Sequence, residues 1–374
     1  MKKLTLVSAA VAGAFALSAS AAEVTIYGLI DSGFSYTHNG AEMGNAKNSF
    51  TLDSGSNLGS RFGFKGEEDL GNGFKVGFVL ENGFSHDTGT LTDNDRLFGR
   101  EAVVYLDSDY GKLRFGRMTQ MTGSTGTTSL MNSRFSAMGT GWGNVYGHNA
   151  VFAGKFSRMD NMIMYSTPKF AGFQAHVQYS SGIDAKKETG TENTGEVTRY
   201  IALGADYSNG PFTAIAVVEQ NRYKTEKDKS DDDGMTFNLS LSYDFEVAKV
   251  FVTGQYAKDM RELGKDAVDT TASNVFGTKS ELPKDGYGID LGISAPLAGG
   301  KLYVTAGYGS YELSDNSSQE MDRWVASVGY EYFLSKRTSV YGGVGYYVDS
   351  YDNFANDRDN AEMFGTSFGL IHRF

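Results

Sequence analysis

The chain has 374 residues, no cysteine and a formal net charge of −11. The missing cysteines exclude a disulfide framework, a thiolate metal site and a cysteine nucleophile. A phosphate-backbone partner would require a basic surface, so the acidic balance argues against nucleic acid. The 22 tyrosines, 25 phenylalanines and 47 glycines, with only 4 prolines, favour strands joined by tight turns.

Residues 1–21 predict a signal peptide. "MKK" is a short basic start, "LTLVSAAVAGAFAL" is apolar, and "SASAA" offers small residues for cleavage after Ala21 or Ala22. A membrane-anchoring helix is the weaker alternative, because the apolar run is short and ends in a cleavage pattern. No later segment has 18 consecutive apolar residues, so no transmembrane helix is expected in the mature chain, 22–374.

Alternation is the dominant pattern of the mature chain. In "FNLSLSYDF", 237–245, every second residue is apolar and the residues between are Asn, Ser, Ser and Asp. "YGIDLGIS" and "WVASVGYEY" repeat this pattern, which is typical of strands because their side chains alternate between two faces. A soluble sandwich would bury the apolar face, whereas a membrane barrel would turn it to lipid. Aromatic residues at both ends of these strands favour the membrane barrel, as interfacial girdles.

Connection lengths predict the number of strands. Seven short turns lie at 69–73, 108–111, 169–172, 208–211, 246–248, 296–300 and 334–337. They alternate with eight longer segments at 37–49, 86–95, 121–157, 182–196, 224–234, 261–284, 314–320 and 350–361. This asymmetry predicts an all-β fold in one domain, a 16-stranded antiparallel transmembrane β-barrel with short turns at one end and long loops at the other. A barrel of this size keeps an aqueous bore.

The aromatic run "FGTSFGLIHRF", 364–374, is predicted to be the last strand. An open sheet edge cannot face lipid, because its backbone groups would be unpaired. We therefore expect this strand to pair with the first one, near "EVTIYGLIDSGFSY", 23–36. Phe364, Phe368, Leu370 and Phe374 would share one face.

Five collinear motifs resemble the general porins of Gram-negative bacteria, most closely the neisserial and burkholderial branch. They are "SRFGFKGEEDLGNGFKVGFVLE", "LFGREAVVYLDSDYGKLRFGR", "RMDNMIMYSTPKFAGF", "YFLSKRTSVYGG" and "GLIHRF". The resemblance implies a passive channel for ions and small hydrophilic solutes in the bacterial outer membrane, surrounded by outer-membrane lipids and lipopolysaccharide. It also implies a homotrimer, a third loop, 121–157, folded into the lumen as a constriction, and a terminal Phe374 that the outer-membrane assembly machinery reads.

The resemblance also matches specific arginines. Arg61, Arg100 and Arg158 correspond to arginines that line the constriction in the family, and Arg117 corresponds to a fourth in related porins. The alternation places Arg61 opposite Phe62 and Phe64, so its side chain should point into the lumen. The same alternation places Arg117 on the apolar face of its strand, unless a bulge changes the face.

The third loop departs from the family pattern. Many members carry carboxylates there, facing the arginines, but residues 121–157 contain no Asp or Glu and do contain Arg134 and Lys155. A ring of like charge sets ion preference locally, so we hypothesise a positive constriction that favours anions. Asp160, Glu67 and Glu81 are the residues that could restore acidity.

The sequence also bears on functions other than a channel. A barrel enzyme needs a nucleophile and a base side by side, and no hydrolase motif occurs, so no catalytic activity is predicted. "SDDDG" lacks the spacing of a calcium loop, and the five histidines are scattered, so no metal or cofactor site is predicted. A solute-specific porin, an adhesin and a soluble β-sandwich protein remain as alternatives.

Overall fold

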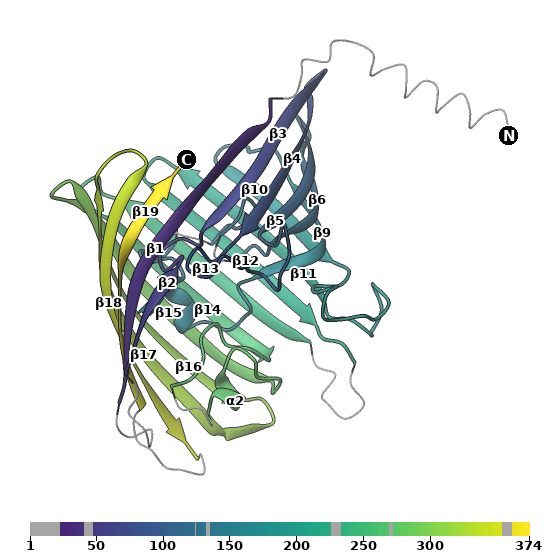
Figure 1. Ribbon diagram of the computed structural model, residues 1–374. Coiled ribbons are helices and arrows are strands. Elements are labelled where there is room, and N and C mark those ends of the chain that lie inside the picture. The colour runs from purple at the N-terminus through teal and green to yellow at the C-terminus, as the bar shows by residue number, and fades with distance from the viewer. Residues whose placement is uncertain are drawn as a thin grey trace.

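The protein is one closed sheet wrapped into a barrel (Figure 1). The structure, a computed structural model, describes residues 23–40, 48–123, 125–131, 135–225, 233–268, 272–353 and 361–374. The predicted signal peptide, residues 1–21, lies outside the described residues. Within the part of the chain that is described, no helix is both long and apolar enough to span a membrane.

The strands of the first half are β1 (Thr25–Asn39), β2 (Asn48–Ser54), β3 (Arg61–Gly71), β4 (Phe74–Gly83), β5 (Glu101–Ser108), β6 (Gly111–Thr119), β7 (Gly141–Trp142), β8 (Val145–Tyr146), β9 (Arg158–Ser166) and β10 (Phe173–Ser180). Those of the second half are β11 (Arg199–Asn209), β12 (Phe212–Arg222), β13 (Gly234–Asp244), β14 (Lys249–Met260), β15 (Lys284–Leu297), β16 (Gly300–Leu313), β17 (Asn316–Phe333), β18 (Thr338–Asp352) and β19 (Ala361–Arg373). The helical segments among the described residues are short: η2 (His148–Ala150) and α2 (Ser273–Phe276).

The prediction of sixteen antiparallel barrel strands is confirmed. The main sheet holds 17 segments, but β2 and β3 pair with successive stretches of the same neighbour, residues 32–38 and 25–29 of β1. They are therefore one barrel strand, interrupted at 55–60. The small β7–β8 ribbon forms a separate sheet.

The barrel closes between its first and last strands, as predicted. β1 and β19 run antiparallel from Leu29 opposite Arg373 to Asn39 opposite Met363, and the purple and yellow ribbons lie side by side in Figure 1. The Gly28 amide donates to the Phe374 carbonyl at 3.2 Å, and the Phe374 amide donates to the Gly28 carbonyl at 3.0 Å. The last residue thus belongs to the seam and leaves no sheet edge there.

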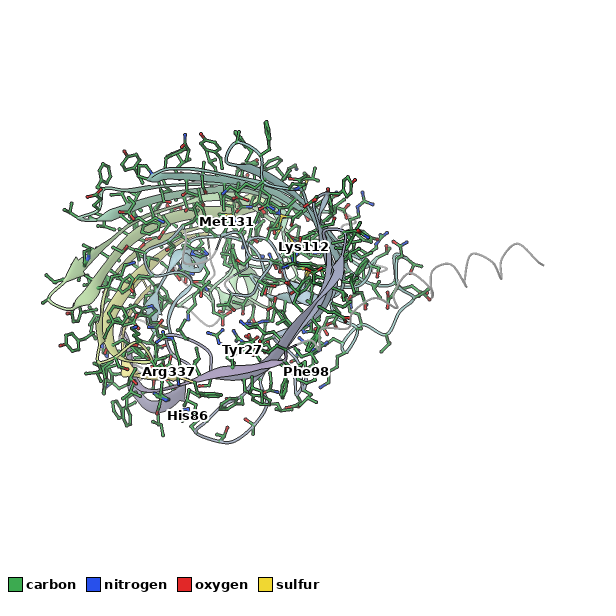
Figure 2. All side chains as sticks on the ribbon, turned by 90° about the horizontal axis from the view of Figure 1, so that it is seen from above. Tyr27, His86, Phe98, Lys112, Met131 and Arg337 are labelled. Carbon is green, nitrogen blue, oxygen red and sulfur yellow. The ribbon has the colours of Figure 1, made fainter. Side chains whose placement is uncertain are left out.

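The barrel wall is apolar outside and polar inside. On β13, Leu239 is 54% exposed, whereas its neighbours Asn238 and Ser240 are 4% and 0% exposed. Around the wall, seen from above in Figure 2, side chains project outward from the ring of strands. This polarity is the inverse of a soluble protein's and is what a lipid-facing barrel requires.

An aromatic belt crosses five neighbouring strands of the outer surface near the long loops. Phe237 of β13 lies 6.3 Å from Tyr256 of β14, measured between ring centroids, and Tyr256 pairs in register with Tyr287 of β15. Tyr308 of β16 continues the row at 6.1 Å from Tyr287 and 4.5 Å from Trp324 of β17. Amphipathic rings favour the level of the lipid headgroups, so the belt marks one predicted interface.

The predicted long segments 86–95, 121–157 and 182–196 connect strands of the barrel, and two other predicted long segments need correction. The segment 314–320 was expected to be a longer loop, but β16 extends to Leu313 and β17 begins at Asn316, leaving a tight hairpin. The segment 261–284 was expected outside the barrel, but Lys284 begins β15, and 261–283 is here called the sixth loop. It instead folds inward, where Leu263, Val268 and Phe276 pack in one buried cluster with Phe152 of the third loop.

Candidate functional site

The third loop enters the barrel and is fastened to the polar face of the wall. Backbone and side-chain hydrogen bonds of 2.6 to 3.3 Å join the loop to five strands, β12, β14, β15, β17 and β19. In chain order they link Thr122 with Glu219, Ser136 with Asp290, Asn144 with Ser367, Tyr146 with Ser327, Ala150 with Arg323, and Ala153 with Gln255. The polar residues on the lumen face of the strands thus hold the loop.

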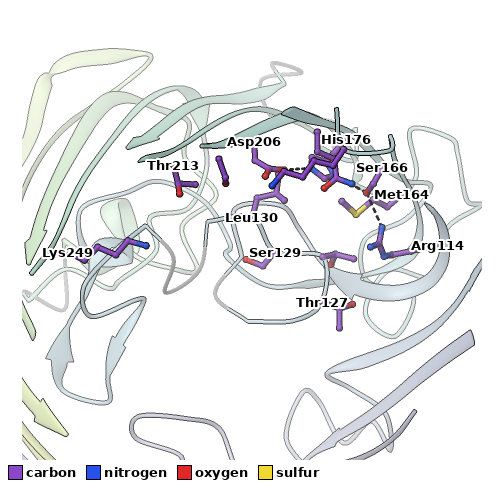
Figure 3. Close-up of a pocket in the computed structure, with 14 residues that line it drawn as sticks. Arg114, Thr127, Ser129, Leu130, Met164, Ser166, His176, Asp206, Thr213 and Lys249 are labelled. Atoms are coloured by element: carbon purple, nitrogen blue, oxygen red, sulfur yellow. Dashed lines mark hydrogen bonds and ion pairs between the residues drawn. The ribbon is translucent and has the colours of Figure 1, made fainter. Parts of the chain in front are cut away.

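The loop contributes to two cavities. The inner cavity, ≈ 360 Å³, lies beside the ends of β6, β9–β12 and β14 that lead into the short turns, and residues 127–130 of the loop line it (Figure 3). The outer cavity, ≈ 290 Å³, lies at the long-loop end. It is lined by 154–159 (except Phe156), by part of the fourth loop around Asp184, and by 262–264 of the sixth loop.

An arginine-rich wall faces the lumen on β3–β6 and β9. Glu81 of β4 is shared by two arginines: its Oε1 lies 2.6 Å from Arg100 Nε and 3.9 Å from Arg61 Nη1. The Tyr27 hydroxyl donates to the other oxygen of Glu81 at 3.0 Å. Arg100 and Arg158 both reach the third loop, because each donates to Thr125 Oγ1, at 3.4 and 2.9 Å.

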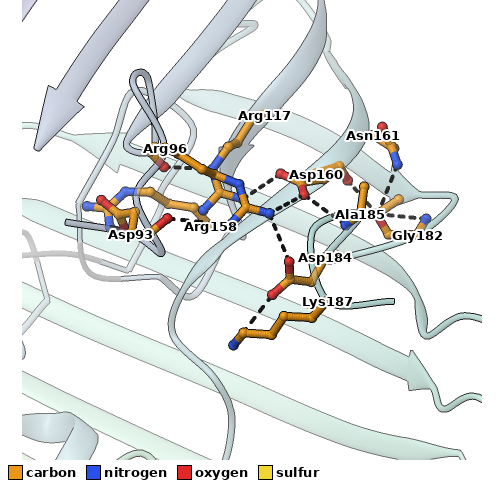
Figure 4. Close-up of polar contacts among 12 residues, drawn as sticks. Asp93, Arg96, Arg117, Arg158, Asp160, Asn161, Gly182, Asp184, Ala185 and Lys187 are labelled. Carbon is orange, nitrogen blue, oxygen red and sulfur yellow. Dashed lines mark hydrogen bonds and ion pairs between the residues drawn. The ribbon is translucent and has the colours of Figure 1, made fainter. Parts of the chain in front are cut away.

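A second group of charges extends the wall toward the long loops (Figure 4). Asp160 accepts from Arg117 Nη1 at 2.6 Å and from Arg96 Nη2 at 2.8 Å. Arg96 Nη2 also lies 2.8 Å from Asp184 of the fourth loop. Arg158 Nη1 donates to Asp93 Oδ1 at 2.9 Å. The second loop, at 84–100, therefore supplies Asp93 as a partner to the strand residue Arg158, and the fourth loop, at 181–198, supplies Asp184 as a partner to Arg96 of the second loop.

Arg117 reaches the lumen because the wall is irregular beside it. Gly116 has φ +123°, and the register between β6 and β9 shifts between Gly116 and Met118. A positive φ of this kind is readily available only to glycine. This is the bulge on which the interpretation of Arg117 depended, and Arg117 lines the outer cavity with Lys155.

The remaining predicted residues are placed as follows. Lys155 lies at the end of the third loop, with its Nζ 3.1 Å from Glu262 Oε1. Arg134 lies outside the described residues. Three carboxylates were named as residues that could restore negative charge at the constriction. Glu81 and Asp160 lie in the arginine wall, whereas Glu67 pairs with Lys75 at 3.0 Å near a short turn.

Two loop carboxyls have shifted acidities. Burial raises the pKa of Asp184, but the hydrogen bond and charge of Arg96, with Lys187, outweigh burial and hold that pKa below its ordinary value. Burial raises the pKa of Glu262 above its ordinary value, against the opposing charge of Lys155.

Sequence reasoning missed Arg96, Asp93 and Asp184. All three lie in long loops that alternation cannot place relative to the strands. The family pattern of arginines gave no sign of them, and only the folded loops bring them to the wall.

Among the residues that line each cavity, cationic side chains outnumber carboxylates. The outer cavity is lined by four cationic side chains, Arg117, Lys155, Arg158 and Lys187, and three carboxylates, Asp93, Asp184 and Glu262. The inner cavity has three cationic side chains, Arg114, Lys169 and Lys249, and the single carboxylate Asp206. The whole chain is nevertheless acidic.

Comparison with known proteins agrees with this architecture. A family model described as Gram-negative porin matches residues 7–353. The chain belongs to this porin family. It is 31% identical to an outer membrane porin of Bordetella pertussis, over 100% of both chains.

Solved structures agree on the fold. An anion-selective porin from Comamonas acidovorans superposes with a TM-score of 0.69 at 24% identity, covering 94% of this chain and 100% of that one. The trimer form of OmpT, an outer membrane protein of Vibrio cholerae, gives 0.65 at 17% identity, with coverages of 95% and 100%.

Fold and family together establish the general activity. The porin is an outer-membrane β-barrel that forms a channel for passive diffusion of ions and small hydrophilic solutes. The family consists of channels rather than enzymes. The lipid-facing apolar surface, the polar lumen and the inward third loop are the parts that make such a channel.

Proposed function

We propose that this porin is an anion-preferring channel whose constriction lies between the third loop, 121–157, and the arginine wall. Arg61, Arg100, Arg117 and Arg158 form one side of the passage, and Lys155 adds a cation from the loop. The observation that carries the proposal is the positive excess in both cavities, together with a described third loop that contributes no carboxylate.

Ion pairs with carboxylates weaken the positive electrostatic field of the arginine wall without removing it. Glu81, Asp93 and Asp160 hold Arg100, Arg158 and Arg117 at 2.6 to 2.9 Å, and Arg61 lies 3.9 Å from Glu81. This pairing fixes the positions of the arginines and neutralises much of their charge. A solute passing through meets oriented guanidinium groups and the remaining excess of positive charge. Charges lining a narrow passage act on a permeating ion with little screening, whereas exposed charges are screened over about 10 Å.

A solute-specific porin is the second candidate. The sixth loop also fills part of the barrel, with Leu263 and Phe276 buried against the third loop. Two inward loops leave less room than one, which suits a narrower range of solutes. An adhesin role finds no comparable support among the described residues.

Reversal potentials in planar bilayers under a KCl gradient test the anion preference. The expected sign is that of an anion-preferring channel, and cation preference would refute the proposal. Lys155→Gln and Arg158→Gln should each move the reversal potential toward cations, because each leaves its carboxylate partner, Glu262 or Asp93, unbalanced. Lys336→Gln is the matched control, since it removes one charge from an exposed short turn.

The assembly is part of the same proposal. Residues 1–21 would be removed on export through the periplasm, and Phe374 would be read by the outer-membrane assembly machinery. The mature chain would form a homotrimer in contact with outer-membrane lipids and lipopolysaccharide, in keeping with the trimer form of the Vibrio cholerae protein of like fold. A heat-modifiable trimer band on a gel is the expected result, and a band of monomer size under all conditions would contradict it.

A further inference from the structure

Two cations of the inner cavity, Arg114 and Lys169, are held differently from the arginines of the wall. In the arginine wall, every arginine described above lies within ion-pair distance of a carboxylate. Arg114 of β6 instead donates to a hydroxyl, with Nη1 at 3.0 Å from Ser166 Oγ, and has no described carboxylate within ion-pair distance (Figure 3). Lys169 likewise has no ion pair with the described residues.

A polar chain across four neighbouring strands orients Arg114. Ser166 Oγ lies 2.9 Å from His176 Nδ1, and His176 Nε2 lies 2.8 Å from Asp206 Oδ1. If His176 is neutral, the Asp206 carboxylate requires the ring proton on Nε2, which leaves Nδ1 to accept from the Ser166 hydroxyl. The Ser166 oxygen then accepts from Arg114, and the directions of all three hydrogen bonds agree.

This series of hydrogen bonds leaves most N–H groups of the Arg114 guanidinium available to a ligand. Arginine carries five N–H donors in a planar fork, and the hydrogen bond to Ser166 uses one of them. Ser166, His176 and Asp206 are themselves buried, at 2%, 8% and 6% exposed, so the positioning groups are fixed while Arg114 remains partly exposed. Lys169 and Lys249 add positive charge to the same cavity.

We propose that the inner cavity is a binding site for a divalent tetrahedral oxyanion, namely inorganic phosphate or the phosphate group of a small monoester. The inference rests on the proposed anion preference and names a solute class for it. The guanidinium fork matches two oxygens of a phosphate group. The hydroxyls of Ser208 and Thr213 line the remainder of the cavity, whose ≈ 360 Å³ lies at the lower end for small-molecule sites.

The position of the site suits a transient binding step. It lies at the short-turn end of the barrel. An anion therefore reaches it from the short-turn side of the constriction, without first passing the third loop. Passage requires binding that is favourable but weak enough for release. Arg114 is the binding residue, and His176 is a positioning residue that acts through Ser166.

Single-channel recording in KCl with added phosphate tests the site. Phosphate at pH 8, applied from the short-turn side, should reduce the current in a saturable manner, whereas acetate at the same charge concentration should not. Arg114→Gln should weaken the phosphate block by about tenfold, as expected for the loss of roughly 1.4 kcal/mol. Lys75→Gln, at an exposed position near another short turn, is the matched control and should leave the block unchanged.

Two further variants separate the paired hydrogen-bond geometry of the Arg114 guanidinium from its positive charge. Arg114→Lys keeps the charge, so the KCl reversal potential should not move while the phosphate block weakens, because an ammonium cannot make the paired contact. His176→Gln should weaken the block without lowering KCl conductance.

The outcomes distinguish this inference from the channel proposal. A phosphate block equal in wild type, Arg114→Gln and Arg114→Lys overturns the site even if the channel prefers anions. Block by acetate as strong as by phosphate overturns the divalent specificity. Cation preference in KCl alone overturns the proposed selectivity.

Discussion

His148 of the third loop should make the closed position of that loop sensitive to acid. Its side chain is 2% exposed, and neither ring nitrogen has a hydrogen-bond partner among the described residues. The ring packs against Phe152 and Phe156, at centroid distances of 5.7 and 5.9 Å. Burial lowers the pKa of His148 to about 4 from its ordinary value of 6.5.

The magnitude follows from proton linkage. The packed loop binds the proton more weakly than a released loop would, so the closed position is fully stable above pH 6.5 and loses stability as the pH falls. At pH 5 the loss is about 2 kcal/mol, and it levels off near 3 kcal/mol below pH 4, at 1.36 kcal/mol per pH unit. His148→Leu removes the titrating ring and should remove this part of the pH dependence.

The two tryptophans make this measurable. Trp142 of the third loop is 4% exposed and Trp324 on the lipid-facing side is 63% exposed, so a Trp324→Phe background leaves Trp142 as the sole reporter of loop position. Mild urea titrations at pH 7.5 and 5 should show a loss of loop stability near 2 kcal/mol that His148→Leu abolishes. Equal losses in both proteins would refute the assignment to His148.

Two other perturbations follow from buried contacts. Arg323→Met should release both inward loops, because Arg323 and Asp349 are 0% exposed and Arg323 also donates to the carbonyls of Ala150 and Asp266, both at 2.9 Å. Leaving Asp349 buried and unpaired costs about 3–5 kcal/mol, which should appear as noisier, larger single-channel currents. The double variant with Asp349→Leu should recover much of the order. Deleting Phe374 removes its hydrogen bonds to Gly28 and should lower the yield of heat-modifiable trimer, while deletion of an exposed loop residue should not.

The strand pattern could be predicted because it depends on local rules. Alternation over 237–245 determines which side chains face lipid, and the short turns mark where one strand ends and the next begins. Closure followed from the cost of an open edge in lipid. The hairpin at 314–315 was placed wrongly because the polar residues Asn316 to Glu320 were interpreted as a loop, although a polar sequence can extend a strand beyond the membrane.

The candidate site was predictable only in part. Arg61 follows from alternation, but Arg117 needed the bulge at Gly116, which the sequence permits without requiring. The inward fold of 261–283 was missed because its apolar residues, such as Leu263 and Phe276, are spaced by polar ones without a regular period. Their burial depends on the third loop, which lies more than a hundred residues away in the chain.

The sign of the whole-chain charge is a poor guide to the preference of the channel. Many carboxylates, such as those of Glu246 and Asp315, lie exposed in turns and hairpins, where salt screens them within about 10 Å. A permeating ion meets mainly the side chains that line its path, and there the cations of the inner cavity outnumber its one carboxylate. An acidic surface and an anion-preferring lumen are therefore compatible, and substitutions of exposed carboxylates should leave the reversal potential nearly unchanged while substitutions at Arg158 move it.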